Sequence, residues 1–147
     1  MTDSKQYERL IKQTEALLMG ENNLIANMSN VSALLNETLE DINWVGFYLY
    51  EQDELILGPF QGKVACVHIP LGKGVCGTAA ESLESIVVPD VNAFPGHIAC
   101  DSASLSEIVI PIVKDNKLIG VLDIDAPIKK RFSDHDKHYL EQVVTYL

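Results

Sequence analysis

Residues 106–125 have the sequence SEIVIPIVKDNKLIGVLDID, in which two apolar runs flank the polar turn KDNK. This pattern predicts two strands, 106–113 and 118–125. Because alternate residues of a strand point to opposite sides of a sheet, each strand has two distinct faces. One face is aliphatic and carries Ile108, Ile110, Ile112, Leu122 and Ile124, whereas the other carries the carboxylates Glu107, Asp123 and Asp125. The segment therefore predicts a sheet with one side suited to helix packing and one acidic side.

The strand expected upstream, NWVGFYLYE at residues 43–51, divides in the same way. Val45, Phe47 and Leu49 form its aliphatic face, and Trp44 and Tyr48 belong to the opposite face. If like faces align, two aromatic rings and three carboxylates meet on one side of the sheet. Further strands are expected at 54–60, 63–70 and 86–90.

Helical periodicity occupies both ends of the chain. Apolar residues recur at helical spacing over 4–19 and 24–39, and a short helix is expected at 78–85. A final helix is expected to begin at Ser133, where Ser-Asp-His-Asp resembles a capping box. These elements predict a single α+β domain over residues 1–147. We expect a central antiparallel sheet, with the N- and C-terminal helices on one face and a ligand pocket on the other.

Composition narrows the possible partners and location. The chain has 147 residues and a net charge of −10, so nucleic acid and anionic membrane are disfavoured as partners. No apolar run is long enough to span a bilayer, and no signal peptide is apparent, so a cytoplasmic protein is expected. The three cysteines, Cys66, Cys76 and Cys100, are odd in number, which argues against a structural disulfide framework. They could be buried hydrophobic residues, metal ligands or redox groups.

The acidic face has two possible interpretations. Its carboxylates could simply face water, as on many antiparallel sheets. However, Asp123 and Asp125 lie within the very apolar run LIGVLDIDAP, and the loop at 91–105 is long enough to cover them. Covered carboxylates repel one another and lose hydration, which raises at least one pKa. Such clusters usually bind a cation or handle a proton, so we expect the acids to line a functional pocket.

The glycine-rich stretch GKGVCG, residues 72–77, matches a dinucleotide-binding fingerprint. The match fails in context, because only about eight residues precede the next expected strand, whereas a βαβ unit needs roughly 30. The glycines more simply permit a tight turn from strand to helix. Cys76 would then lie near a helix N-terminus, where the helix dipole is expected to lower the pKa of its thiol.

A zinc site is the alternative to redox chemistry for the cysteines. Cys66-x-His68 and His97-x-x-Cys100 offer two cysteines and two histidines, enough for tetrahedral coordination. Their spacing does not match the common zinc modules, so no metal is predicted.

Three stretches carry a specific resemblance: GPFQGKVACVHIPLGKGVCGTAAE, VPDVNAFPGHIACDSASLSEIVIPI and GVLDIDAPIKKRFSDHD. They are similar to the free methionine-(R)-sulfoxide reductases, small enzymes with a GAF-like fold. The resemblance implies that Cys100 is the nucleophile and that Cys66 and Cys76 are the other redox cysteines. It also implies that Trp44 and Tyr48 form an aromatic wall around the substrate, and that the substrate-binding acids are Glu107, Asp123 and Asp125.

The implied reaction reduces free L-methionine (R)-sulfoxide to methionine through a cysteine sulfenic acid and an intramolecular disulfide that thioredoxin recycles. Glu107 or Asp125 is the expected proton donor, Cys66 the expected resolving cysteine and Cys76 the alternative. No bound cofactor is expected, and a cytoplasmic homodimer is implied. The alternative hypothesis is a non-catalytic GAF module that binds a small ligand as a sensor. That hypothesis explains the fold and the pocket but leaves the three thiols beside an acidic cluster without a role.

Overall fold

The computed structural model describes residues 2–97 and 103–147. In these ranges the helices are α1 (Ser4–Leu18), α2 (Leu24–Thr38), α3 (Gly74–Ser82), the short 3-10 helix η1 (Val91–Ala93) and α4 (Asp134–Val144). The strands are β1 (Trp44–Glu51), β2 (Glu54–Gln61), β3 (His68–Pro70), β4 (Ile86–Val88), β5 (Ser106–Lys114) and β6 (Lys117–Ala126). The strands form one sheet in the order β3-β2-β1-β6-β5-β4, and every neighbouring pair is antiparallel. The predicted α+β class with a central antiparallel sheet is confirmed.

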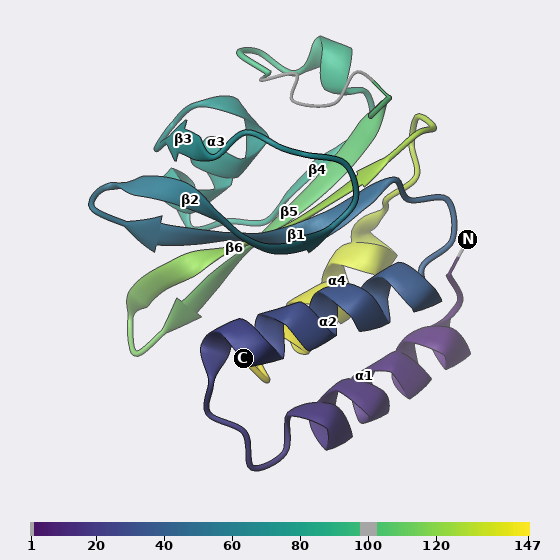
Figure 1. The fold of residues 1–147 in the computed structure, drawn as a ribbon. Coiled ribbons are helices and arrows are strands. Elements are labelled where there is room, and N and C mark those ends of the chain that lie inside the picture. The colour runs from purple at the N-terminus through teal and green to yellow at the C-terminus, as the bar shows by residue number, and fades with distance from the viewer. Residues whose placement is uncertain (1, 98–102) are drawn as a thin grey trace.

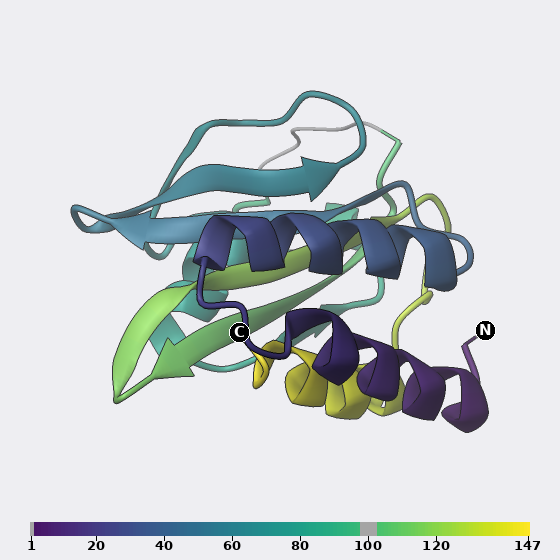
Figure 2. The same cartoon turned by 60° about the horizontal axis from the view of Figure 1, so that its bottom comes forward.

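The helices divide unequally between the two sides of the sheet. Helices α1, α2 and α4 lie on one side, and α3 with η1 lies on the other (Figure 1). Turning the molecule brings α2 in front of the sheet, with α1 and α4 beside each other (Figure 2). The core between this helical layer and the sheet contains the expected aliphatic face, including Val45, Phe47, Ile108, Ile110, Ile112, Leu122 and Ile124. Period-two alternation therefore assigned the strand faces correctly.

Side-chain caps fix where two of the helices begin. Asp3 and Gln6 form a capping box at the start of α1. Ser133 and Asp136 form another at α4, as the sequence predicted. The second box extends into the core, because Asp136 also accepts a 2.6 Å hydrogen bond from the Tyr7 hydroxyl. This contact ties α1 to α4 within the helical layer.

Two predicted elements have different bounds in the structure. The strand expected at 63–70 is regular only in β3, because Gly62 adopts a φ of 141° and the chain leaves the ladder after it. The helix expected at 78–85 begins earlier, at Gly74, and ends where Leu83 adopts a left-handed φ of 59°. The prediction placed the start after the glycines, but Gly77 lies inside the helix. A Cβ there would lie 2.4 Å from the Pro70 carbonyl oxygen, so glycine is what permits α3 to approach β3.

No helix in the part of the chain that the structure describes combines the length and apolarity needed to cross a membrane.

Candidate active site

Three carboxylates meet on the sheet face opposite the helical layer, as predicted. Glu107 on β5 is directly opposite Asp125 on β6, and the next residue on the same face of β6 is Asp123. The register of β1 places Trp44 opposite Asp125 on the other side. Glu107 and Asp123 are each only 6% exposed. These acids line a small cavity of about 50 Å³ together with Tyr48, Ile69, Lys73, Gly74, Val75, Cys76, His97 and Ser104.

The cavity favours protonated acids over charged ones. Burial, followed by the charges of Asp123 and Asp125, raises the pKa of Glu107 well above its ordinary value. Burial also raises the pKa of Asp123, although contacts with Glu107 and Cys76 oppose that shift. Asp123 Oδ1 is buried without a hydrogen-bond partner. The site therefore holds both a proton source and an acceptor that a cationic ligand could satisfy.

Cys76 contacts this acidic cluster from the first turn of α3. Its side chain is buried, and Sγ lies 4.0 Å from Glu107 Oε2. Burial and the charges of Asp123 and Glu107 raise the pKa of the Cys76 thiol well above its ordinary value. The prediction that the helix dipole would lower this pKa is wrong, because desolvation and neighbouring negative charge outweigh the dipole. Cys76 is accordingly a protonated, free thiol at neutral pH.

Cys66 lies in the irregular segment between β2 and β3, and it is disulfide-bonded. The predicted aromatic residues hold this segment by its backbone. Tyr48 Oη donates a 2.9 Å hydrogen bond to the Cys66 carbonyl, and Trp44 Nε1 donates a 3.1 Å hydrogen bond to the Lys63 carbonyl. The Trp44 ring also stacks on Tyr48 and Phe60, with centroid distances of 6.1 and 5.2 Å. Tyr48 thus links the cavity directly to the segment that carries the disulfide-bonded Cys66.

Not every predicted site residue is found at the cavity. Trp44 supports Tyr48 but is not among the described residues that line the cavity. Cys100, the expected nucleophile, lies outside the described residues. The two histidines considered as zinc ligands have different partners. His68 pairs with Glu54 on an exposed edge, whereas His97 Nε2 lies 3.9 Å from Glu107 Oε1. A disulfide-bonded Cys66 also lacks the thiolate that zinc requires.

Sequence reasoning missed the part that His97 and Ser104 play in this cavity. Both belong to the 91–105 loop, next to its undescribed part. This loop has no periodic pattern from which the direction of its side chains could be inferred. His97 was considered only as a metal ligand. Burial lowers the pKa of His97, so its imidazole is neutral beside Glu107. Ser104 is held by Asn43, whose side-chain amide donates a 3.1 Å hydrogen bond to its hydroxyl.

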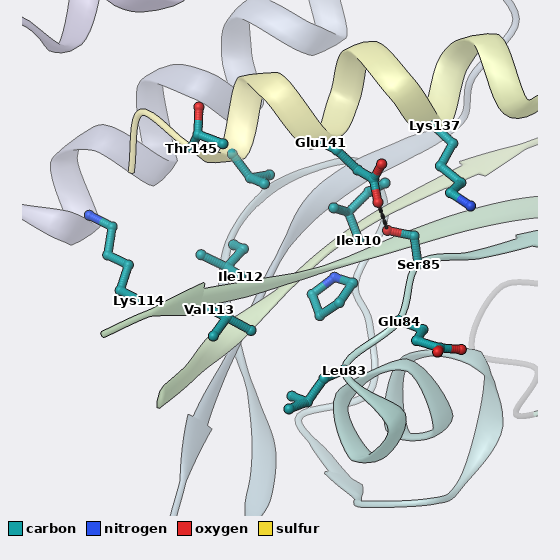
Figure 3. Close-up of a pocket in the computed structure, with 12 residues that line it drawn as sticks. Leu83, Glu84, Ser85, Ile110, Ile112, Val113, Lys114, Lys137, Glu141 and Thr145 are labelled. Carbon is teal, nitrogen blue, oxygen red and sulfur yellow. Dashed lines mark hydrogen bonds between the residues drawn. The ribbon is translucent and has the colours of Figure 1, made fainter. Parts of the chain in front are cut away.

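A larger hollow of about 700 Å³ lies elsewhere, between α4, β5 and the turn after α3. Its floor includes Ile110 and Ile112, and Ser85 Oγ donates a 2.7 Å hydrogen bond to Glu141 across it (Figure 3). None of the described residues that line it is a cysteine, and its lining contains two acids and two lysines. The smaller cavity, with its thiol and paired carboxylates, is therefore the candidate active site.

Comparison with known proteins agrees with this choice. A family model described as the GAF domain matches residues 23–147. The chain is 53% identical over 147 residues to the free methionine-R-sulfoxide reductase of Escherichia coli, covering 100% of this chain and 89% of that protein. This chain belongs to the GAF-domain family of free methionine-R-sulfoxide reductases.

Two further members support the family assignment. The free methionine-R-sulfoxide reductase of Saccharomyces cerevisiae is 50% identical over 144 residues, covering 92% of this chain and 80% of that protein. The fRMsr of Staphylococcus aureus, solved in complex with its substrate, is 60% identical with a TM-score of 0.94 and covers 99% of this chain and 95% of that one. The predicted family and fold are confirmed.

Proposed function

We propose that this protein reduces free L-methionine (R)-sulfoxide to L-methionine. Its family membership carries the proposal, and the site chemistry supports it. The observation that supports it best is a disulfide-bonded Cys66 whose carbonyl accepts a hydrogen bond from Tyr48, a residue that lines the acidic cavity. This hydrogen bond joins the segment that carries the disulfide-bonded cysteine to the acidic cavity.

Sulfoxide reduction needs a thiolate on sulfur and an acid at oxygen, because the sulfur becomes electrophilic only when the oxygen gains a proton. We assign the thiolate to Cys100 and the acid to Glu107, with Asp125 as the alternative donor. The position of Glu107, which is opposite Asp125 in the sheet and only 6% exposed, supports this role. Burial and the neighbouring carboxylates raise the pKa of Glu107, which favours its protonated form at pH values where an ordinary glutamate has ionised.

The proposed cycle oxidises and then reduces two cysteines of this chain. Attack of Cys100 on sulfur, with proton transfer to oxygen, releases methionine and leaves a sulfenic acid on Cys100. The thiol of Cys66 then condenses with the sulfenic acid, forming a disulfide and releasing water. Thioredoxin, through its own dithiol, reduces that disulfide and completes the cycle. Cys66 is the preferred resolving cysteine, because it is disulfide-bonded in the structure while Cys76 is a buried free thiol.

The carboxylates also account for selectivity toward the free amino acid. Asp123 Oδ1 is a buried acceptor without a partner, and a substrate ammonium group would satisfy it together with Asp125. A peptide-bound methionine sulfoxide has no ammonium group to offer. The cavity of about 50 Å³ is smaller than typical ligand pockets of roughly 300 Å³ or more, so substrate entry must widen it. Tyr48 and Trp44 would form the wall beside the methyl group.

Three features of the physiological setting are part of the same proposal: thioredoxin as the reductant, a homodimer and a cytoplasmic location. The N-terminal helices are the proposed dimer surface. Leu17, Met19 and Ile25, at the junction of α1 and α2, are 44%, 74% and 51% exposed, which supports an apolar contact there.

An NADPH-coupled thioredoxin assay with both epimers of free methionine sulfoxide tests the proposal. We expect NADPH oxidation with the (R) epimer and none with the (S) epimer or a peptide-bound sulfoxide. Cys66→Ser should still release methionine in a first turnover but fail to cycle with thioredoxin, whereas Cys100→Ser should lose both. Absence of oxidation with either epimer would favour the alternative, a non-catalytic sensor.

A further inference from the structure

The acidic cavity brings the thiol of Cys76 close to two of its carboxylates, and these are ligand atoms that can bind a metal ion. Cys76 Sγ and one carboxylate oxygen each from Glu107 and Asp123 all lie within 4.8 Å of one another. The three side chains come from α3, β5 and β6, and all are buried. Ligand atoms around a tetrahedral zinc ion are separated by roughly 3.4–3.8 Å. The longest separation would therefore have to shorten by at most about 1.4 Å to reach coordination distance.

We propose that Cys76, Glu107 and Asp123 bind a thiophilic divalent cation such as Zn²⁺, which inhibits the enzyme by taking the place of the substrate ammonium. The inhibition rests on the proposed function, but the binding does not. On binding, a bond forms between the cation and Cys76 sulfur, and the protons of the Cys76 thiol and of the Glu107 carboxyl group both pass to solvent. The two carboxylates supply the other charges, so no oxidant or reductant is needed.

Three observations beyond the cluster itself support a cation as the occupant. Asp123 Oδ1 has no hydrogen-bond partner although Asp123 is only 6% exposed, so it lacks the compensation that a buried oxygen normally has. The cavity of about 50 Å³ has room for an ion with one or two waters, each of which needs roughly 10–15 Å³. His97 Nε2 lies 3.9 Å from Glu107 Oε1, which places an imidazole next to one of the proposed ligands.

The donor set selects among metals. A thiolate with two carboxylates and an imidazole suits Zn²⁺ or Cd²⁺. Mg²⁺ and Ca²⁺ prefer oxygen ligands alone, whereas one of the three ligand atoms here is the sulfur of Cys76. Lys73 also lines the cavity, and its positive charge would weaken the binding of a metal ion that gains no bond to sulfur.

The test uses the full-length protein oxidised by its substrate and freed of reductant, so that Cys76 remains the free thiol. Titration with Cd²⁺ should produce a thiolate-to-metal charge-transfer absorbance that saturates at one ion per chain, and Zn²⁺ should displace it. Cys76→Ser should abolish the absorbance, and Glu107→Gln should weaken binding at least tenfold. Glu54→Gln, in the exposed pair with His68, is the matched control and should bind like the wild type.

Lack of the absorbance in the oxidised protein, or equal Cd²⁺ affinity in Glu107→Gln, would overturn the inference. Circular dichroism establishes that each variant is folded. If Cys76→Ser does not fold, the Cd²⁺ affinity of Glu107→Gln still decides the test. Zn²⁺ should also raise the apparent KM for the sulfoxide, and the half-inhibiting concentration should rise at least tenfold in Cys76→Ser. A protein that reduces the (R) epimer but shows no absorbance refutes this site alone. A protein that binds Cd²⁺ but reduces neither epimer refutes the proposed reaction alone.

Discussion

Glu107→Gln should stabilise the protein at neutral and alkaline pH while it removes the proposed proton donor. Glu107 is 6% exposed, and burial with the charges of Asp123 and Asp125 raises its pKa. The folded protein therefore keeps a proton on Glu107 at pH values where the unfolded chain has released it. Glutamine is nearly the same size, is neutral at every pH and can donate hydrogen bonds to the neighbouring carboxylates.

The size of the effect follows from proton linkage. Below the unfolded glutamate pKa of about 4.3, both states hold the proton and Glu107 adds no pH dependence. Above it the folded state holds one more proton than the unfolded state, so the free energy of unfolding falls by about 1.4 kcal/mol per pH unit. The decline ends where Glu107 ionises in the folded protein. The advantage of the variant should thus grow by about 1.4 kcal/mol per unit, or roughly 3–6 °C in Tm for a domain of this size.

Thermal and urea unfolding from pH 5 to pH 8 measures this difference. Among the described residues, the other titratable groups that line the cavity are Tyr48, Lys73, Cys76, His97, Asp123 and Asp125, and they are common to both proteins. Glu54→Gln, in an exposed pair, controls for the general loss of one negative charge. The reasoning fails if Glu107→Gln is less stable than the wild type at pH 8. It also fails if its advantage is the same at every pH.

Three other substitutions test separate parts of the structure. Asp123→Asn should raise the KM for the free sulfoxide about tenfold or more, with a smaller change in kcat, because it weakens a buried charged contact to the ammonium. An unchanged KM in steady-state assays would exclude that contact. Gly77→Ala should destabilise the protein by roughly 1–3 kcal/mol in urea unfolding, since its Cβ would lie 2.4 Å from the Pro70 carbonyl oxygen; wild-type stability would show that α3 can move away freely. Tyr7→Phe should lower the free energy of unfolding by about 1–3 kcal/mol, because it leaves the buried Asp136 without its 2.6 Å hydrogen bond. The kcat/KM of this variant should stay at the wild-type value. A loss of activity would contradict the separation of the helical layer from the site.

The strand faces were predictable because period two is a local property of the chain. In β1, β5 and β6 the alternation placed the aliphatic residues against the helices and the acids together on the other side. The capping box at Ser133 was likewise a local signal. The residues that surround the acids were not predictable in the same way, since His97 and Ser104 come from a loop without periodicity.

Tertiary effects account for what the sequence could not supply. The start of α3 was misplaced because glycine usually disfavours a helix, whereas Gly77 is required by the close approach to Pro70. The pKa of Cys76 was predicted in the wrong direction because the helix dipole was the one influence visible in the local sequence. Burial and the carboxylates of two strands distant in sequence outweigh the dipole, and they act on the thiol only when the sheet is assembled. The backbone contacts of Trp44 and Tyr48 to residues 63 and 66 also depend on the assembled fold.

The pairing of sulfoxide reduction with loss of thiols is the most direct test of the proposed chemistry. Fully reduced protein, which has three cysteines, is mixed with an excess of one epimer without any reductant, and both methionine and remaining thiols are counted. The (R) epimer should yield one methionine per chain while the thiols fall from three to one, and the (S) epimer should change neither. Equal yields from both epimers, or methionine release with all three thiols retained, would contradict the account.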